Sequence, residues 1–313
     1  MSLHRLGVVG PLVALLLACL FFSLQTSRFL SGDNFALILQ QVMVVGVLAI
    51  GQSLVILTAG IDLSCGMVMA LGSVVMTTLA TRSGVPPLVA IAGGVAVTGA
   101  IGLANGLLVT RVKLPPFIVT LGMMNIAFAL TQLVSKSQTV TDLPPLLLWL
   151  GTSARIGRTP IAYGVLAMLA LYVVAWWLLR NTAAGRHVYA VGNHREAARL
   201  SGINTERVLL AVYTLAGVCA GLAALLAVAR TGVGDPQAGQ TENLDTVTAV
   251  VLGGTSLFGG RGVIIGSLLG ALIVGVFRNG LTLMGVSSVY QILITGVLVI
   301  LAVATDQWSR RPA

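Results

Sequence analysis

Apolar residues fill most of the chain in long runs, and the short polar, glycine-rich or proline-rich intervals between them mark its turns. A run of about 20 apolar residues can cross the hydrocarbon core of a bilayer as a helix. The pattern predicts about ten such segments, at residues 8–26, 34–58, 66–81, 86–110, 117–134, 160–179, 207–230, 245–258, 263–284 and 286–305. The segments 66–81 and 245–258 are short, so we expect them to be tilted, broken or enclosed by other helices.

Proline and glycine residues mark the connections between these segments. Pro86-Pro87 and Pro115-Pro116 precede helical runs, where proline suits the first turn. The stretch Gly259-Gly260-Arg261-Gly262 predicts a tight turn, because glycine accepts left-handed backbone conformations. The longer interval 135–159 is expected to hold a surface helix at 146–150. The pattern alone leaves the number of spans open, because 135–159 is either a surface loop or a re-entrant segment, and 245–262 is either a short span or a re-entrant segment.

The composition places the chain among membrane proteins. It has 313 residues, of which 57% are hydrophobic and 9% charged, and its mean hydropathy is +0.99. Soluble domains carry about a quarter charged residues, so a large soluble core is excluded. We expect an all-α, polytopic transmembrane helical bundle, with residues 1–313 in one transmembrane domain and no second soluble domain.

The net charge of +9 indicates orientation rather than nucleic-acid binding, because no basic patch with stacking aromatic residues accompanies it. Basic residues gather in the interval 180–207, whereas 231–244 has none. Since cytoplasmic connections are the basic ones, 180–207 is predicted to be cytoplasmic and 231–244 external. Counting spans from there puts Arg5, Arg111, Lys113, Arg261, Arg310 and Arg311 inside, and, against the pattern, Lys136, Arg155 and Arg158 outside.

The cytoplasmic interval contains a short helix-forming segment, HREAARLSGIN, at residues 194–204. Asn193 is a suitable N-cap, and Gly202 suits the position just past the C-terminus. Glu196 lies in the first turn, where negative charge is favourable, and Arg199 follows at i+3, within pairing distance. From the residues alone, this segment is either a solvated connector with ordinary caps or a rigid protrusion that another protein can move.

A wider resemblance favours the second alternative. Ala197 and Ala198 present a small surface, and Glu196-Ala197-Ala198-x-x-x-Gly202 resembles the EAA loop of ATP-binding cassette (ABC) importer permeases. The stretch GRHVYAVGNHREAARLSGINTERV resembles the coupling-loop region of the ribose/galactose/xylose-type sugar permeases of that class. Further similar stretches are LTAGIDLSCGMVMALGS, LANGLLVTRVKLPPFIVTLGM, VLGGTSLFGGRG and YQILITGVLVILAVATDQW, and the stretches AVYTLAG, FRNGL and AVATDQW are most similar to fructose-type members. The resemblance runs from about residue 30 to the C-terminus.

The resemblance implies a division of labour among several proteins. Two copies of such a chain form a pathway through the bacterial inner membrane, a periplasmic sugar-binding protein docks outside, and a cytoplasmic ATPase docks on the loop. The residues that match the family's coupling motif are Glu196, Ala197, Ala198, Arg199 and Gly202. The implied function is import of a sugar such as fructose or ribose by alternating access, with ATP and Mg bound by the partner subunit.

The residues agree with a chain that has no catalytic site of its own. A P-loop needs the pattern GxxxxGK[ST], which is absent, and the two lysines, Lys113 and Lys136, follow no glycine-rich strand-to-helix turn. No nucleophile elbow, paired carboxylate site or zinc-ligand cluster is present either. We therefore expect no catalytic residue, no metal and no cofactor in this chain.

A neutral sugar needs neutral hydrogen-bonding groups along its path, and several polar residues interrupt the apolar segments. The candidates for the substrate path or gate are Gln41, Gln52, Asp62, Ser64, Asn105, Asn125 and Gln291. The alternative role is to bridge neighbouring helices, because amide side chains do this in bilayers. The residues alone leave the two roles equally open.

Asp62 is the most unusual of these residues, because an ionised carboxylate in hydrocarbon is costly. It is expected either to cap the helix that follows, with Gly60 allowing the break, or to act as a gate. Asn243 and Asp245 are expected to cap the external end of their own span. On this view Asp62 is the one good candidate for an ionisable group within the spans.

Two other functions fit the residues less well. A secondary transporter or facilitator usually buries several ionisable groups near the midplane, and the sequence offers Asp62 alone. An integral membrane enzyme needs clustered acids or histidines, whereas His4, His187 and His194 are all predicted to lie outside the spans. Membrane lipid is an expected contact; nucleic acid is not.

Overall fold

The computed structural model describes residues 3–157 and 159–308, so that Arg158, Arg310 and Arg311 of the orientation analysis lie outside the described residues. Its helices are α1 (Leu3–Gln25), α2 (Gly32–Leu57), α3 (Cys65–Thr81), α4 (Pro87–Thr110), α5 (Pro116–Ser135), α6 (Pro145–Leu148), the 3₁₀ turn η1 (Trp149–Gly151), α7 (Tyr163–Asn181), α8 (Ala183–Asn193), α9 (Arg195–Leu200), α10 (Thr205–Thr231), α11 (Glu242–Leu252), α12 (Ile264–Leu283) and α13 (Ser288–Trp308). Two short strands, β1 (Ser153–Ile156) and β2 (Thr159–Ala162), pair in antiparallel fashion.

The predicted polytopic helical bundle is confirmed. Among the described residues, seven helices are long and apolar enough to cross a membrane, namely α1, α2, α4, α5, α7, α10 and α12. The surface helix expected at 146–150 is also present, as α6 and η1. Each of these elements follows from a local pattern of apolar runs and breaks, which explains why their positions were predictable.

Two predicted segments differ from the structure. The segment 160–179 begins as a strand, because residues 159–162 pair with 153–156, and α7 starts only at Tyr163. The segment 245–258 is not continuous helix: α11 has 11 residues and ends where Gly253 and Gly254 follow, the latter with φ +82°. Since an α-helix rises about 1.5 Å per residue, α11 spans roughly half of the hydrocarbon core.

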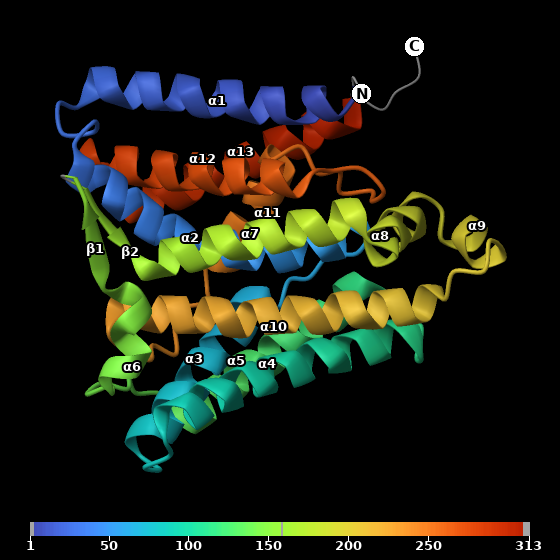
Figure 1. Cartoon of the computed structure of the whole chain (residues 1–313), viewed down its shortest axis with the longest axis horizontal. Coiled ribbons are helices and arrows are strands. Elements are labelled where there is room, and N and C mark those ends of the chain that lie inside the picture. The colour runs from blue at the N-terminus through green and yellow to red at the C-terminus, as the bar shows by residue number, and fades with distance from the viewer. Residues whose placement is uncertain (1–2, 158, 309–313) are drawn as a thin grey trace.

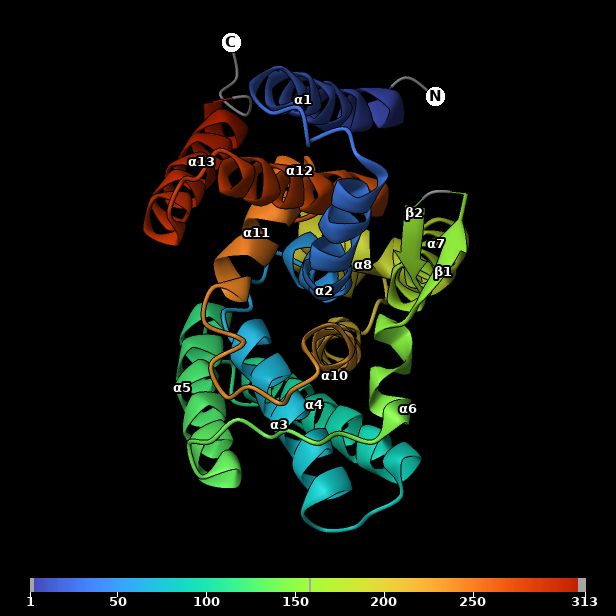
Figure 2. The same cartoon turned by 90° about the vertical axis from the view of Figure 1, so that its left-hand side faces the viewer.

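The helices form two groups around a central pair. Figure 2 shows α2 and α10 in the middle, α3, α4 and α5 on one side, and α1, α12 and α13 on the other, with α11 between α12 and α5. The central helix α10 packs against α4, α2 and α3, and α1 packs against α12. Figure 1 shows α8 and α9 at one end of the bundle and the hairpin with α6 at the opposite end. By the charge analysis, the α9 end is cytoplasmic and the hairpin end external.

Small residues bring α4 and α10 into close contact. A Cβ atom built on Gly102 would overlap the Tyr213 carbonyl oxygen and would lie 3.0 Å from the Gly217 Cα. In a bilayer, helices associate through this kind of close packing, because lipid offers no hydrophobic driving force between them. The α4–α10 contact therefore depends on the absence of side chains at these positions.

Candidate coupling site and transport path

Residues 194–204, here called the coupling segment, contain the short helix α9, which projects from the end of the bundle that the charge analysis predicts to be cytoplasmic (Figure 1). His194, with φ −158°, separates α8 from α9, and its Nδ1 accepts a hydrogen bond of 3.1 Å from the Ala197 amide. The predicted N-cap, Asn193, is therefore wrong by one residue, because Asn193 still belongs to α8. Gly202 follows α9 with φ +86°, the left-handed conformation expected just past a helix C-terminus.

The predicted pair within α9 is present. Arg199 Nε donates to both carboxylate oxygens of Glu196 at 3.1 Å, and Arg199 Nη2 donates to Glu196 Oε1 at 2.5 Å. This hydrogen bonding holds the pKa of Glu196 below its usual range. Both side chains are exposed, so solvent screens the pair and its main effect is to orient the outer face of α9.

The two alanines of the motif face opposite ways. Ala197 is exposed, whereas Ala198 is buried at 6% exposure in a small cluster with Val191 and Leu209. The expectation that both alanines present a surface to a partner is therefore wrong for Ala198, which anchors α9 to α8 and α10. Leu200, which the sequence analysis missed, is 76% exposed at the tip of α9. Leu200 lies between the motif residues Arg199 and Gly202 but is not part of the motif, so the motif does not indicate it.

The end of α8, which leads into the coupling segment, packs on the glycine-rich loop between α11 and α12. The Gly260 amide donates to the Leu57 carbonyl at the end of α2 at 3.0 Å, and the Tyr189 hydroxyl donates to the Gly262 carbonyl at 3.0 Å. A Cβ atom built on Gly192 would overlap the Leu57 carbonyl oxygen and lie 2.7 Å from the Gly260 amide nitrogen. The tight turn predicted at 259–262 is confirmed, and its role is to let α8, α2 and the loop meet.

Three of the predicted path residues meet in a buried network. Asp62 Oδ1 accepts from the Ser64 amide at 2.8 Å and from the Ser64 hydroxyl at 2.6 Å, and Asn105 Nδ2 donates to the Ser64 hydroxyl oxygen at 3.2 Å. Each of the three residues is at most 5% exposed. Asp62 thus binds Ser64, the residue that precedes α3, and accepts from no amide of α3 itself, so the predicted cap on that helix is not formed by its side chain.

Asn243 contacts a helix other than its own. Its Oδ1 accepts from the Gly66 amide at 2.5 Å, and its Nδ2 lies 3.6 Å from the Met124 sulfur of α5. The expectation that Asn243 caps the end of its own span is therefore wrong, since it occupies an unpaired amide in the first turn of α3. The N-termini of the two short helices, α3 and α11, meet at this point.

A groove of about 930 Å³ opens at the cytoplasmic end. Its lining includes His194 and Glu196 of the coupling segment, and it extends past Gly60 to Tyr213. The Tyr213 hydroxyl is buried and has no hydrogen-bond partner among the described residues. The groove therefore connects the surface of the coupling segment with the region of the Asp62 network.

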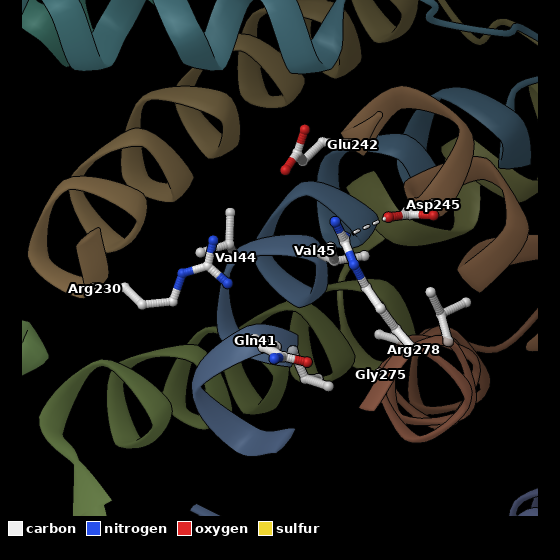
Figure 3. A pocket seen from close by; sticks show the side chains of 11 residues that line it. Gln41, Val44, Val45, Arg230, Glu242, Asp245, Gly275 and Arg278 are labelled. Carbon is white, nitrogen blue, oxygen red and sulfur yellow. Dashed lines mark hydrogen bonds and ion pairs between the residues drawn. The ribbon is translucent and has the colours of Figure 1, made fainter. Parts of the chain in front are cut away.

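A second cavity, of about 140 Å³, lies in the external half of the bundle between α2, α10, α11 and α12. Figure 3 shows Gln41, Arg230, Glu242, Asp245 and Arg278 around it. Arg278 Nη1 donates to Asp245 Oδ2 at 3.1 Å, and the Asp245 side chain is 10% exposed.

This cavity overturns two expectations. Asp245 was expected to cap its own helix, but it pairs with Arg278 of α12 instead. Asp62 was expected to be the one candidate for an ionisable group within the spans, yet four further charged side chains line this cavity. Glu242 was missed because 231–244 was interpreted as an external loop, whereas α11 starts at Glu242; Arg230 and Arg278 lie within the predicted segments 207–230 and 263–284. The charge of Arg278 within the apolar run 263–284 was the available signal.

Comparison with known proteins finds relatives along nearly the whole chain. A family model described as "Branched-chain amino acid transport system / permease component" matches residues 34–303. The chain belongs to this family. The fructose import permease protein FrcC of Rhizobium meliloti is 46% identical to this permease over 317 residues, which cover 99% of the permease and 88% of that relative.

Other relatives of the permease carry related names. The ribose import permease protein RbsC of Escherichia coli K12 is 40% identical over 94% of the permease and 92% of the relative. The L-arabinose ABC transporter permease protein AraH of Azospirillum brasilense is 34% identical over 98% and 89%, respectively. The resemblance to ABC sugar permeases is thereby confirmed, and the permease is a multi-pass protein of the bacterial inner membrane.

The remaining predicted path residues of the permease lie apart from one another. Gln52 is 1% exposed within α2, and neither of its amide atoms has a hydrogen-bond partner among the described residues. Asn125 is exposed on α5, where Nδ2 donates to the Leu121 carbonyl at 3.3 Å. Gln291 of α13 donates to the Thr282 hydroxyl at 3.1 Å. The structure thus joins Asp62, Ser64 and Asn105, whereas Gln41 lines the external cavity and the other three stand alone.

Proposed function

We propose that this permease is the membrane-spanning subunit of an ATP-driven importer of a monosaccharide such as fructose or ribose, and that it moves the sugar by alternating access. The observation that supports this most directly is α9, a capped helix that projects from the basic end of an otherwise apolar bundle. The names of the relatives, which state fructose, ribose and L-arabinose transport, support the class of solute.

In this proposal the permease works with three partners. A cytoplasmic ATPase docks on α9 and binds ATP and Mg, so that the permease itself holds no cofactor and carries out no covalent chemistry. A periplasmic sugar-binding protein docks at the external end, where α6, β1 and β2 form a structured surface (Figure 1). A second copy of the chain completes the pathway.

The packing of the coupling segment suggests how force from the ATPase would travel. Ala198 ties α9 to the end of α8, and the end of α8 packs on the loop between α11 and α12. The same loop is hydrogen-bonded to the end of α2 through Gly260. A displacement of α9 would therefore reach α11, whose residue Asn243 holds the first turn of α3 and whose residue Asp245 faces the external cavity.

The alternative is a secondary transporter, and the charged residues of the external cavity give it a specific observation in its favour. Ion-coupled carriers often place such groups within the membrane. The two proposals differ in their energy source. Uptake by the permease alone in vesicles with an ion gradient supports the carrier, whereas uptake that requires the ATPase supports the importer.

The exposed tip of α9 offers a direct experiment. The permease, its ATPase and its binding protein would be produced together from neighbouring genes, and sugar uptake and ATPase retention on the purified permease would be measured. Leu200→Ser should weaken ATPase binding by about 10- to 150-fold, since burying a leucine side chain contributes about 1.5–3 kcal/mol. Ser201→Ala, at the exposed next position, is the matched control. Unchanged retention with Leu200→Ser, or full uptake after deletion of the ATPase, would contradict the proposal.

A further inference from the structure

Charged side chains from three helices and one amide from a fourth converge on the external cavity (Figure 3). Arg230 reaches it from α10, Glu242 and Asp245 from α11, Arg278 from α12 and Gln41 from α2. Charged groups on membrane-spanning helices face protein or water rather than lipid. Arg230 and Arg278 are exposed residues that line this cavity, so their guanidinium groups can meet water or a ligand there.

The cavity is polar but carries no net charge when all four groups are ionised. Its two guanidinium groups balance its two carboxylates. An isolated cation or anion would therefore meet an equal number of like and opposite charges. A neutral solute that can both donate and accept hydrogen bonds is better matched to such a set of groups.

Part of this hydrogen-bonding capacity is unused. Arg278 and Asp245 form an ion pair at 3.1 Å, but Arg230 and Glu242 are in no ion pair with any described residue. Gln41 Oε1 is shielded from solvent and has no hydrogen-bond partner in the part of the chain that the structure describes. A contact that served only to join the helices would be expected to satisfy a buried oxygen such as Gln41 Oε1, whereas Arg230 is exposed and Glu242 is half-buried. Here a donor and two acceptors remain available to a ligand.

The remaining walls of the cavity are apolar. Val42, Val45, Ala271 and Val274 line it beside the polar groups. A monosaccharide presents both kinds of surface, because its hydroxyl groups donate and accept hydrogen bonds and its C–H groups pack against apolar side chains. The volume of about 140 Å³ limits the ligand to a small solute.

We propose that this external cavity, between α2, α10, α11 and α12 of a single chain, binds the hydroxyl groups of the transported monosaccharide. The inference rests on the proposed function. Arg230 donates to the sugar, Glu242 and Gln41 accept from it, and the Asp245–Arg278 pair holds α11 and α12 at the spacing of the site. Since α11 continues into the glycine-rich loop on which α8 packs, the site is connected through that loop to the helix that precedes the coupling segment.

The test measures initial uptake rates of the complete transporter against a series of sugars. The parent monosaccharide and deoxy analogues that each lack one hydroxyl would be compared in the original permease and in Arg230→Gln and Glu242→Gln. Arg28→Gln and Asp33→Asn serve as matched controls, because both residues are exposed near the external end of the bundle and neither lines the cavity. Arg230→Lys, which keeps a charged donor, is the conservative variant.

For the parent sugar, KM should rise about tenfold or more in each cavity variant, because a hydrogen bond to a charged group contributes about 1.5–3 kcal/mol. For one deoxy analogue this penalty should disappear, since the bond is already missing. Arg230→Lys should recover part of the loss, and the control variants should match the original. These ratios between sugars do not depend on how much of each variant reaches the membrane.

Loss by a common factor for every sugar, or an unchanged KM, would overturn the inference while leaving sugar import intact. Competition of uptake by an amino acid such as leucine, with loss of that competition in the cavity variants, would overturn the proposed ligand. If the transporter with the unsubstituted permease takes up no monosaccharide, the proposed function itself is refuted. The measurement of the parent sugar with the unsubstituted permease identifies that case.

Discussion

Gly192 lies near the end of α8, just before the coupling segment, and packs closely on the end of α2 and on the glycine-rich loop. The substitution Gly192→Ala tests whether this contact transmits force. The methyl group would overlap the Leu57 carbonyl oxygen and would lie 2.7 Å from the Gly260 amide nitrogen. Those two atoms belong to a hydrogen bond of 3.0 Å between the end of α2 and the glycine-rich loop. Both are backbone atoms, so no side-chain rotation can relieve the overlap.

The expected cost follows from these contacts. Forcing a methyl group into a closely packed position costs about 1–3 kcal/mol, and losing the hydrogen bond between Gly260 and Leu57 costs about 0.5–1.5 kcal/mol. Together they predict about 1.5–4.5 kcal/mol against the observed packing. The opposite contribution, the gain in helix propensity from glycine to alanine, is at most about 1 kcal/mol. The balance is therefore unfavourable, and α8 should separate from the loop.

The assay compares two properties of the purified transporter. ATPase binding to the permease should remain near normal, because α9 keeps its caps and its exposed face. Sugar uptake per ATP hydrolysed should fall, since displacement of α9 would no longer reach the loop between α11 and α12. Gly122→Ala is the matched control, because Gly122 is also helical and has no neighbouring atom within 4 Å of its built Cβ. Equal coupling in the two variants would refute this route of transmission.

Asp62→Asn should lower sugar uptake and the unfolding temperature less than Asp62→Leu. Asparagine can still accept from the buried donors, whereas leucine leaves them unpaired, at a cost of about 1–3 kcal/mol per group. Equal losses in the two variants would show that the charge itself is required. Gly102→Ala should lower the unfolding temperature because its Cβ would overlap the backbone of α10, whereas Gly99→Ala, at 3.4 Å from its nearest neighbour, should be tolerated; the reverse order would contradict the close packing of α4 and α10. Hydrogen bonding from Arg199 holds the pKa of Glu196 below its usual range. The contribution of the Glu196–Arg199 pair is therefore present above that range and is lost as the pH falls through the lowered pKa. ATPase binding should therefore be constant from about pH 6 to pH 8, and a transition within that interval would exclude Glu196 as its source.

The location of the helix α9 and the pair within it could be predicted from the sequence. The concentration of basic residues between 180 and 207, the pair formed by Glu196 and Arg199, and the left-handed Gly202 are all local features. Each depends on residues within a few positions of one another, and caps, i+3 pairs and charge gradients are properties of that range. The one-residue error at the N-cap arose because Asn193 and His194 are both able to accept a hydrogen bond there, and the end of α8 decides between them.

The composition of the external cavity could not be predicted in the same way. Arg230, Glu242 and Arg278 come from three helices, and the pattern of apolar runs carries no information on which helix faces meet. Glu242 was missed for a further reason, because 231–244 was interpreted as a loop outside the membrane. Glu242 lies inside the bundle because the chain continues inward after α10 and starts a helix only there.

The sequence by itself determined which segments are apolar enough to cross a membrane, where the basic residues gather and which segment folds as a separate short helix, because apolar length, charge distribution and helix caps act over short distances along the chain. The tertiary structure decided that Ala198 is an anchor, that Asn243 holds α3 rather than its own helix, and that charged residues enclose a cavity. Those outcomes depend on how closely helices far apart in the chain can approach, and that distance is set by packing across the whole bundle.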